Sequence, residues 1–306
     1  MLSLILIFIL LNPLSNVYPI DKPFFNTTTS PLSVQNNNRK NDPIKINPEN
    51  IGVKVSAKRF AAIDLDSGQL LLQKDSNLRQ PIASITKLMT ALIILDQKPN
   101  WSSEVTMTAG DETVGAFPHI YRGEQVRFID LWKSALVASD NNSILAMIRN
   151  LGLSREEFIQ LMNKKADELD MDYTDFSDPT GLSEKNLSTA LDVARLLQAA
   201  MQKNEIRESV LQPSYSFKIL NSKRKNKVNN TDVLVGSFLN DAQHGYELIG
   251  GKTGYLEEAG YCLGVMISRD GHKILIVVLN SPSIQDRFQD VKAIADWVYS
   301  NYQWGI

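Results

Sequence analysis

Cysteine and histidine are both scarce in this sequence. The 306 residues include one cysteine, Cys262, and three histidines. A single cysteine cannot form a disulfide within the chain, and three scattered histidines do not provide the clustered ligands of a Cys/His metal site. We therefore expect no disulfide and no bound metal, and Cys262 is predicted to be a small apolar residue of the core.

The sequence also has no large excess of positive or negative charge. Lysine and arginine number 32 and aspartate and glutamate 34, which leaves a formal net charge of −2. Binding to nucleic acid needs a basic surface that neutralises phosphates, so this balance argues against nucleic acid as a partner. The hydrophobic fraction of 43% is ordinary for a globular protein and allows a sizeable core, in one large domain or two small ones.

The amino terminus has no apolar run long enough for a comfortable membrane span. Leu2 to Leu11, with Ser3 as its only polar member, instead has the length of a signal-peptide core. No lysine or arginine precedes the run, and no clean small-x-small cleavage site follows before Pro19. Residues 1–20 are predicted to be a cleaved signal peptide, with an uncleaved membrane anchor or an ordinary buried segment as alternatives. Either of the first two places the body outside the cytoplasm, in the periplasm or cell envelope.

A polar segment separates this terminus from the rest of the chain. Residues 21–50 are rich in Asn, Thr, Ser, Pro and Lys and have few apolar side chains. Such a composition buries too little surface to offset the entropy of ordering, so a disordered linker is predicted there. The folded body is expected to comprise residues 51–306.

The period of the hydrophobic pattern changes along the folded body. Helical spacing dominates its middle, whereas short runs bounded by turn residues lie at both ends. The layout predicts an α+β fold in which a mostly antiparallel sheet uses both ends of the chain and an all-helical block is inserted between them. The predicted elements are a hairpin at 59–65 and 69–73, helices at about 84–95, 128–138, from 142, 154–170, 189–202 and 284–302, an irregular stretch at 101–126 with one short strand, a loop-rich hairpin at 214–245, and strands at 246–254, 259–268 and 273–280.

Ser84 and Lys87 lie three residues apart near the start of the first predicted helix. Residues at this spacing share one face, so the hydroxyl and the amine can meet as a nucleophile beside a base. The bland alternative is a capping hydroxyl followed by a lysine that extends to solvent. A second Ser-x-x-Lys match, Ser222 to Lys225, lies in a basic, Asn-rich stretch without apolar periodicity and is interpreted as a solvated loop.

Two further motifs occur later in the sequence. Ser139 and Asn141 interrupt two apolar helices, where polar groups need partners, although both are also suited to capping the next helix. Lys252-Thr253-Gly254 ends a predicted strand, and the alternative for Lys252 is an ordinary lysine at a strand edge. The tempting acid pair Glu257 and Glu258 is interpreted as a solvated turn.

Acyl transfer from a peptide explains why these residue types occur together. Ser84 would attack the carbonyl, and Lys87 would act as the base if burial and repulsion from Lys252 lower its pKa. Ser139 would pass the proton to the leaving group, and Asn141 offers an amide donor and an acceptor. Lys252 and Thr253 would attract a terminal carboxylate with a fixed positive charge and a hydroxyl. The mechanism requires no cofactor.

This set of motifs resembles that of the penicillin-binding proteins and serine β-lactamases. Over roughly residues 50 to 306 the chain is similar to the low-molecular-mass penicillin-binding proteins, the D-alanyl-D-alanine carboxypeptidase and endopeptidase family. The resemblance implies a β-lactamase/transpeptidase-like fold and an oxyanion hole formed by the backbone N–H groups of Ser84 and Tyr255. Gly254 would let a substrate strand approach the sheet edge. The segments that carry the likeness are Ala83–Ala91, Asp178–Ser183 and Lys252–Tyr255.

The resemblance also implies a function in peptidoglycan biosynthesis and cell shape. We expect a serine carboxypeptidase that removes the terminal D-alanine from peptidoglycan stem peptides and is inhibited by β-lactams. Cleavage of D-alanyl cross-links by the same site is the alternative, and the Asp178–Ser183 segment and the lack of a carboxyl-terminal β-domain favour it slightly. A β-lactamase is disfavoured because no Glu-x-x-Leu-Asn segment lies between the second and third motifs. A non-catalytic β-lactam sensor has no need of an intact nucleophile and base.

Overall fold

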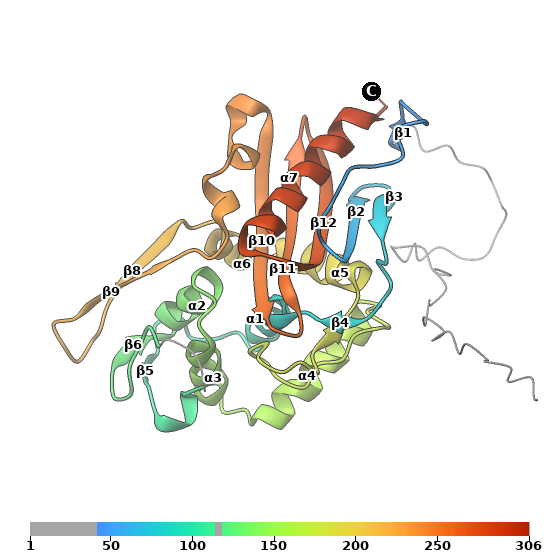
Figure 1. The fold of residues 1–306 in the computed structure, drawn as a ribbon. Coiled ribbons are helices and arrows are strands. Elements are labelled where there is room, and N and C mark those ends of the chain that lie inside the picture. The colour runs from blue at the N-terminus through green and yellow to red at the C-terminus, as the bar shows by residue number, and fades with distance from the viewer. Residues whose placement is uncertain (1–41, 114–117, 306) are drawn as a thin grey trace, which may run out of the picture.

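A computed structural model describes residues 42–113 and 118–305 of the chain (Figure 1). The predicted signal peptide at 1–20 and most of the predicted linker lie outside these residues. Within the part described, no helix is both long and apolar enough to cross a membrane.

A five-stranded antiparallel sheet forms the centre of the fold and joins the two ends of the chain. Its strand order is β10-β11-β12-β2-β3, so β12 pairs with β2 although more than 200 residues separate them, and β10 is an edge strand. This arrangement and the helices around it confirm the predicted α+β class. The strands are β2 (Arg59–Asp64), β3 (Leu70–Lys74), β10 (Tyr246–Leu256), β11 (Gly260–Arg269) and β12 (His272–Ser281).

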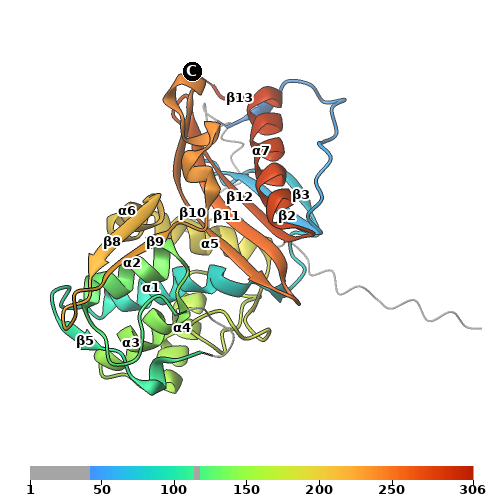
Figure 2. The same cartoon turned by 60° about the vertical axis from the view of Figure 1, so that its left-hand side comes forward.

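Alternating side chains on these strands build a core on each face of the sheet. Along β12, Ile274, Ile276 and Val278 belong to one cluster, and the intervening Leu275 and Val277 belong to the other. The first cluster packs against α7 (Ile284–Asn301), and the second packs against the helical block, with Cys262 buried in it as predicted. Figure 2 shows α7 on one side of the sheet and the helical block on the other.

The helical block lies between β3 and β10 in the sequence. Ser154 and Glu157 form a capping box that opens α4, and Thr189 caps α5 by accepting from Asp192 N. A short helix, α6, was not predicted, because seven residues give too little periodicity to detect. The helices of the block are α1 (Thr86–Asp96), α2 (Phe128–Val137), α3 (Asn141–Asn150), α4 (Arg155–Glu168), α5 (Ala190–Met201) and α6 (Asn204–Val210).

Short two-stranded pairs and single turns of 3-10 helix complete the described structure. The stretch 101–126 contains two short strands instead of the single one predicted, and the predicted hairpin after Pro213 is the β8–β9 pair. The pairs are β4 (Gln80–Pro81) with β7 (Leu187–Ser188), β5 (Glu104–Thr106) with β6 (Gln125–Arg127), and β8 (Ser214–Lys218) with β9 (Lys225–Asn229); the turns are η1 (Ala83–Ile85), η2 (Ala109–Asp111), η3 (Val233–Gly236), η4 (Phe238–Asn240) and η5 (Ala242–His244).

The end of the predicted linker is ordered, which corrects the boundary at residue 50. Strand β1 (Ile44–Lys45) pairs with β13 (Tyr302–Gln303). Asn50 donates to Asn301 Oδ1 at 2.7 Å and accepts from Trp297 Nε1 at 2.9 Å. Composition did not predict this order, because the partners that satisfy these polar groups come from the opposite end of the chain.

Candidate active site

Ser84 lies in η1, directly before α1. The sequence pattern instead predicts that Ser84 is part of the α-helix. The preceding residue, Ala83, has φ +49°, which lies in the left-handed region that costs a non-glycine residue about 1–3 kcal/mol. Ser84 therefore occupies a tight turn at the amino-terminal end of a helix, where the helix dipole favours negative charge.

Lys87 is completely buried and makes three polar contacts at its amine. Nζ lies 2.9 Å from Ser84 Oγ, 2.6 Å from Asn141 Oδ1 and 2.6 Å from the Thr180 carbonyl oxygen. Both the amide oxygen and the carbonyl oxygen can only accept hydrogen bonds. A neutral amine would donate its two hydrogens to them, which leaves its lone pair facing the Ser84 hydroxyl.

The electrostatic setting of Lys87 favours this neutral form. Desolvation by burial lowers the pKa of Lys87 from 10.5 to about 7, against the opposing charges of Asp178 and Asp140. This agrees with the prediction that burial lowers the pKa of Lys87. The two carboxylates keep the pKa from falling further, so both protonation states are accessible near neutral pH.

Ser139 and Asn141 occupy the sharp connection between α2 and α3. Ser139 has φ +61°, and its Oγ accepts a hydrogen bond from Lys252 Nζ at 2.9 Å. The alternative that Ser139 or Asn141 caps α3 is wrong, because Asp140 is the N-cap and accepts from Ser143 N at 3.1 Å. With the cap supplied by Asp140, the side chains on either side of it are free to point to the two lysines.

Lys252 lies on the edge strand β10 with only 2% of its surface exposed. Burial lowers its pKa well below the usual value, and repulsion from Lys87 and Arg287 acts in the same direction, while Asp232 opposes both. This shift acts against the fixed positive charge predicted for Lys252, and an anionic group beside the amine would oppose the shift.

The residues after Lys252 bring β10 against η1. A Cβ built on Gly254 would lie 2.8 Å from Ile82 O and 3.2 Å from Ser84 N, so only glycine permits this approach. Thr253 Oγ1 lies 2.7 Å from Thr231 Oγ1. Tyr255 is half exposed and stacks on Tyr261 with ring centroids 4.3 Å apart. The structure thus gathers all eight predicted site residues around one sheet edge.

Sequence reasoning missed several polar groups behind this arrangement. Arg287 on α7 donates from Nη1 to the Gly254 carbonyl at 3.1 Å. Asp232 is fully buried, and desolvation raises its pKa to about 6 although the charges of Lys252 and Arg287 oppose the rise. Neither residue belongs to a motif. The Thr180 carbonyl could not be recognised either, because a backbone acceptor leaves no signal in side-chain identity.

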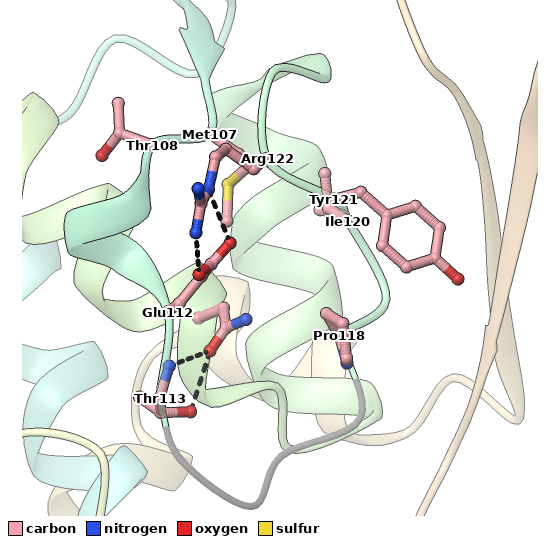
Figure 3. A pocket seen from close by; sticks show the side chains of 9 residues that line it. Met107, Thr108, Glu112, Thr113, Pro118, Ile120, Tyr121 and Arg122 are labelled. Carbon is pink, nitrogen blue, oxygen red and sulfur yellow. Dashed lines mark hydrogen bonds and ion pairs between the residues drawn. The ribbon is translucent and has the colours of Figure 1, made fainter.

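A separate cavity of about 300 Å³ lies beside α3 (Figure 3). Arg122 Nε donates to Glu112 Oε1 at 3.0 Å, and Asn142 Oδ1 accepts from the backbone and side chain of Thr113. These polar groups therefore form hydrogen bonds with one another. Across the described ranges, no group of three or more His, Cys, Asp or Glu side chains is arranged to hold a metal ion.

A serine hydroxyl beside a buried amine, at the edge of an antiparallel sheet and against a helical block, is the architecture of the penicillin-binding serine peptidases. The fold matches the Streptomyces K15 DD-transpeptidase with a TM-score of 0.74 and 26% identity, over 81% of this chain and 99% of that structure.

The family assignment comes from the comparison of sequences. Residues 44–283 match the Peptidase S11 family, described as D-alanyl-D-alanine carboxypeptidase, and the chain belongs to that family. A D-alanyl-D-alanine endopeptidase of Haemophilus influenzae is 34% identical over 74% of this chain and 76% of its own length. The D-alanyl-D-alanine carboxypeptidase DacF of Bacillus subtilis is 30% identical over 81% of this chain and 63% of its own length. The predicted family, fold and enzyme class, a serine peptidase, are confirmed.

Proposed function

We propose that this chain hydrolyses D-alanyl-D-alanine peptides of peptidoglycan through an acyl-enzyme on Ser84 and that β-lactams block it by acylating the same residue. The observation that supports this most directly is the Lys87 amine, 2.9 Å from Ser84 Oγ, with its other two polar contacts made to obligatory acceptors. The lone pair of Lys87 therefore serves as the general base.

In the proposed reaction, Ser84 Oγ attacks the carbonyl of the penultimate D-alanine while Lys87 takes its proton. The backbone N–H groups of Ser84 and Tyr255 stabilise the oxyanion. The proton taken by Lys87 then passes to the leaving amine by way of the Ser139 hydroxyl, which leaves Lys87 neutral for the next step, and Asn141 holds Lys87 in place. Attack by water on the ester, with Lys87 again as base, releases the shortened peptide and restores Ser84.

The terminal carboxylate of the substrate would bind at Lys252 and Thr253. A carboxylate beside Lys252 offsets the burial that lowers its pKa, so substrate and proton bind to this site together. Gly254 lets β10 approach η1 closely, which places this edge strand beside Ser84, and the extended peptide would lie alongside the strand.

We propose carboxypeptidase activity as the main reaction, with cross-link cleavage as the second candidate. The 34% identical relative named D-alanyl-D-alanine endopeptidase favours the second. The two reactions share every step at Ser84 and differ in the leaving group beyond the scissile bond. Digestion of pentapeptide and cross-linked muropeptides, with the products weighed by mass spectrometry, separates them. Release of free D-alanine alone removes the endopeptidase candidate.

We further propose that the enzyme acts in the periplasm or cell envelope and that residues 1–20 direct its export, either as a cleaved signal or as an anchor. The apolar run Leu2 to Leu11 supports this. Cell fractionation of the full chain and of a variant without residues 2–11 tests it. Equal recovery of both from the cytoplasm would contradict export.

Incubation of the protein with a fluorescent penicillin tests the nucleophile. A stable adduct is expected on wild type, and Ser84→Ala should abolish it while circular dichroism shows an unchanged fold. Ser222→Ala, in the second Ser-x-x-Lys match, is the control and should label normally. Rapid turnover of the penicillin would instead indicate a β-lactamase, and an adduct on Ser84→Ala would show that another residue is the nucleophile.

A further inference from the structure

The turn at residues 178–183 connects the base of the proposed site to the protein surface. Thr180 places its carbonyl oxygen 2.6 Å from Lys87 Nζ, and Pro179 places its own 2.6 Å from Thr90 Oγ1 on the next turn of α1. A Cβ on Gly181 would lie 2.3 Å from Ala83 O, so the turn also presses against η1. Its conformation therefore sets the position of both the nucleophile and the base.

A single buried carboxylate organises this turn. Asp178 Oδ2 accepts from Thr180 Oγ1 at 2.8 Å and from the backbone N–H groups of Gly181 and Leu182 at 2.7 Å each. Asn186 holds the start of the turn, since its Oδ1 accepts from Asp178 N and its Nδ2 donates to Asp178 O. These hydrogen bonds determine where the Thr180 carbonyl points.

The second oxygen of Asp178 is paired with a residue near the surface. Arg155, the first residue of α4, donates to Asp178 Oδ1 at 2.7 Å, with 53% of its side chain exposed against 2% for Asp178. Burial raises the pKa of Asp178, but the hydrogen bonds from Thr180 and Leu182 and the charge of Arg155 outweigh it and hold that pKa below 3.8. Asp178 is therefore charged throughout the pH range in which Lys87 titrates.

We propose that Asp178 and Arg155 are positioning residues for the general base: they hold the Thr180 carbonyl against the Lys87 amine and set, through their opposite charges, how firmly that amine keeps its proton. The Asp178 carboxylate favours the charged amine, and Arg155 partly cancels it. Removal of either partner therefore changes the charge on Lys87 in opposite directions. The proposal rests on the function proposed above, in which neutral Lys87 activates Ser84.

Other charged groups also face Lys87 and remain unchanged in the test. Asp140 at the cap of α3 favours the protonated amine, and the charge of Lys87 in turn lowers the pKa of Lys252 on β10. His119 acts on Asp140 from the loop before β6. Because none of these contacts Asp178 or Arg155, a shift caused by either variant reports on the Asp178–Arg155 pair.

The test is the pH dependence of Ser84 acylation by a fluorescent penicillin, measured by stopped flow from pH 5 to 9 and normalised to the plateau of each variant. Acylation needs neutral Lys87, so its rate falls on the acid side of the pKa of that amine. Asp178→Asn removes a negative charge and should move the acid limb to lower pH by about 0.5–1 unit. Arg155→Gln leaves Asp178 uncompensated and should move the limb to higher pH by about 0.3 unit, since its exposed charge is partly screened.

Matched controls carry the same charge changes at exposed positions. Asp175→Asn lies three residues before Asp178, with 69% of the aspartate side chain exposed, and Lys164→Gln lies on α4 with 74% exposed. Neither should move the limb. These controls exclude a general effect of net charge.

Opposite shifts in the two variants support the proposal. Shifts in the same direction, no shifts, or equal shifts in the controls overturn it, because a merely structural role would lower the plateau without reversing the sign. If Asp178→Asn does not fold, Arg155→Gln decides alone: an upward shift supports the pair, and an unchanged limb overturns it. Failure of wild type to label would refute the proposed function instead, so the two failures are distinguishable.

Discussion

A buried amine destabilises a folded protein, and Lys87 shows how large this effect is at one residue. Desolvation lowers its pKa to about 7 from 10.5. Below pH 7 the unfolded chain carries a proton that the folded chain binds far less tightly, a difference of roughly 5 kcal/mol. The same burial that weakens the fold supplies the neutral base that the proposed reaction needs.

We therefore predict that Lys87→Met changes how stability depends on pH. Between pH 7 and 10.5 the unfolded wild type binds one more proton than the folded state, so its free energy of unfolding should rise by up to about 1.4 kcal/mol per pH unit from this residue. The methionine variant lacks this contribution. Urea unfolding of both proteins at pH 7, 8 and 9 measures the difference, which should shift in favour of wild type as pH rises. Parallel pH curves would show that Lys87 is not buried in its neutral form.

At the scale of secondary structure, the site depends on the contact between strand β10 and turn η1. Because Gly254 has no Cβ, β10 can approach η1 more closely than it could with any other residue at this position. Ala83 adopts a left-handed conformation beside it. This contact brings the third motif next to the first. Strand β10 is an edge strand, so in the described structure it has no β partner on its outer side.

Gly254→Ala should separate these two elements. Its Cβ would meet Ile82 O at 2.8 Å, and we expect a loss of about 1–3 kcal/mol in the free energy of unfolding. Penicillin acylation should fall at least about tenfold, because the proposed oxyanion donors, the N–H groups of Ser84 and Tyr255, move apart. Gly264→Ala on the adjacent strand is the control, since its nearest neighbour is Val193 at an ordinary 3.6 Å. Equal acylation by the two variants would contradict a role of the close approach.

At the scale of the whole molecule, the site lies away from the segments at which the described residues begin and end. The site faces the helical block, whereas residues 42–50 pack near the end of α7 (Figures 1 and 2). Ser56 and Ser281 hydroxyls both donate to Asp290 Oδ2 at 2.8 Å, which fastens the amino-terminal segment and β12 to the same helix. Stability at this end should therefore be separable from catalysis.

Asn50→Ala tests that separation. It removes hydrogen bonds to Asn301 and Trp297, and we expect a loss of about 1–2 kcal/mol in the free energy of unfolding with an unchanged rate of penicillin acylation. The exposed neighbour Asn47→Ala should change stability by less than about 0.5 kcal/mol. Chemical denaturation and stopped-flow acylation measure the two properties. A slower acylation by Asn50→Ala would show that the chain ends influence the site.

Local patterns in the sequence determined the order and type of most elements and indicated which residues are candidates for the reacting groups. Strand alternation, helical spacing and turn residues act over a few positions, which is why the hairpins, α2, α4 and α7 were predicted close to their observed bounds. The three motifs could be found for the same reason, since each is only three or four residues long.

Only the tertiary structure decided how those groups are held and charged. Lys87 contacts residues 54 and 93 positions away, and Lys252 contacts Ser139 at a separation of 113. Burial by the surrounding helices lowers the pKa of both lysines, whereas an isolated Ser-x-x-Lys segment would leave its lysine charged in water. The capping by Asp140, the Thr180 carbonyl and the order of residues 42–50 share one physical cause, because each depends on partners that only folding brings within hydrogen-bond distance.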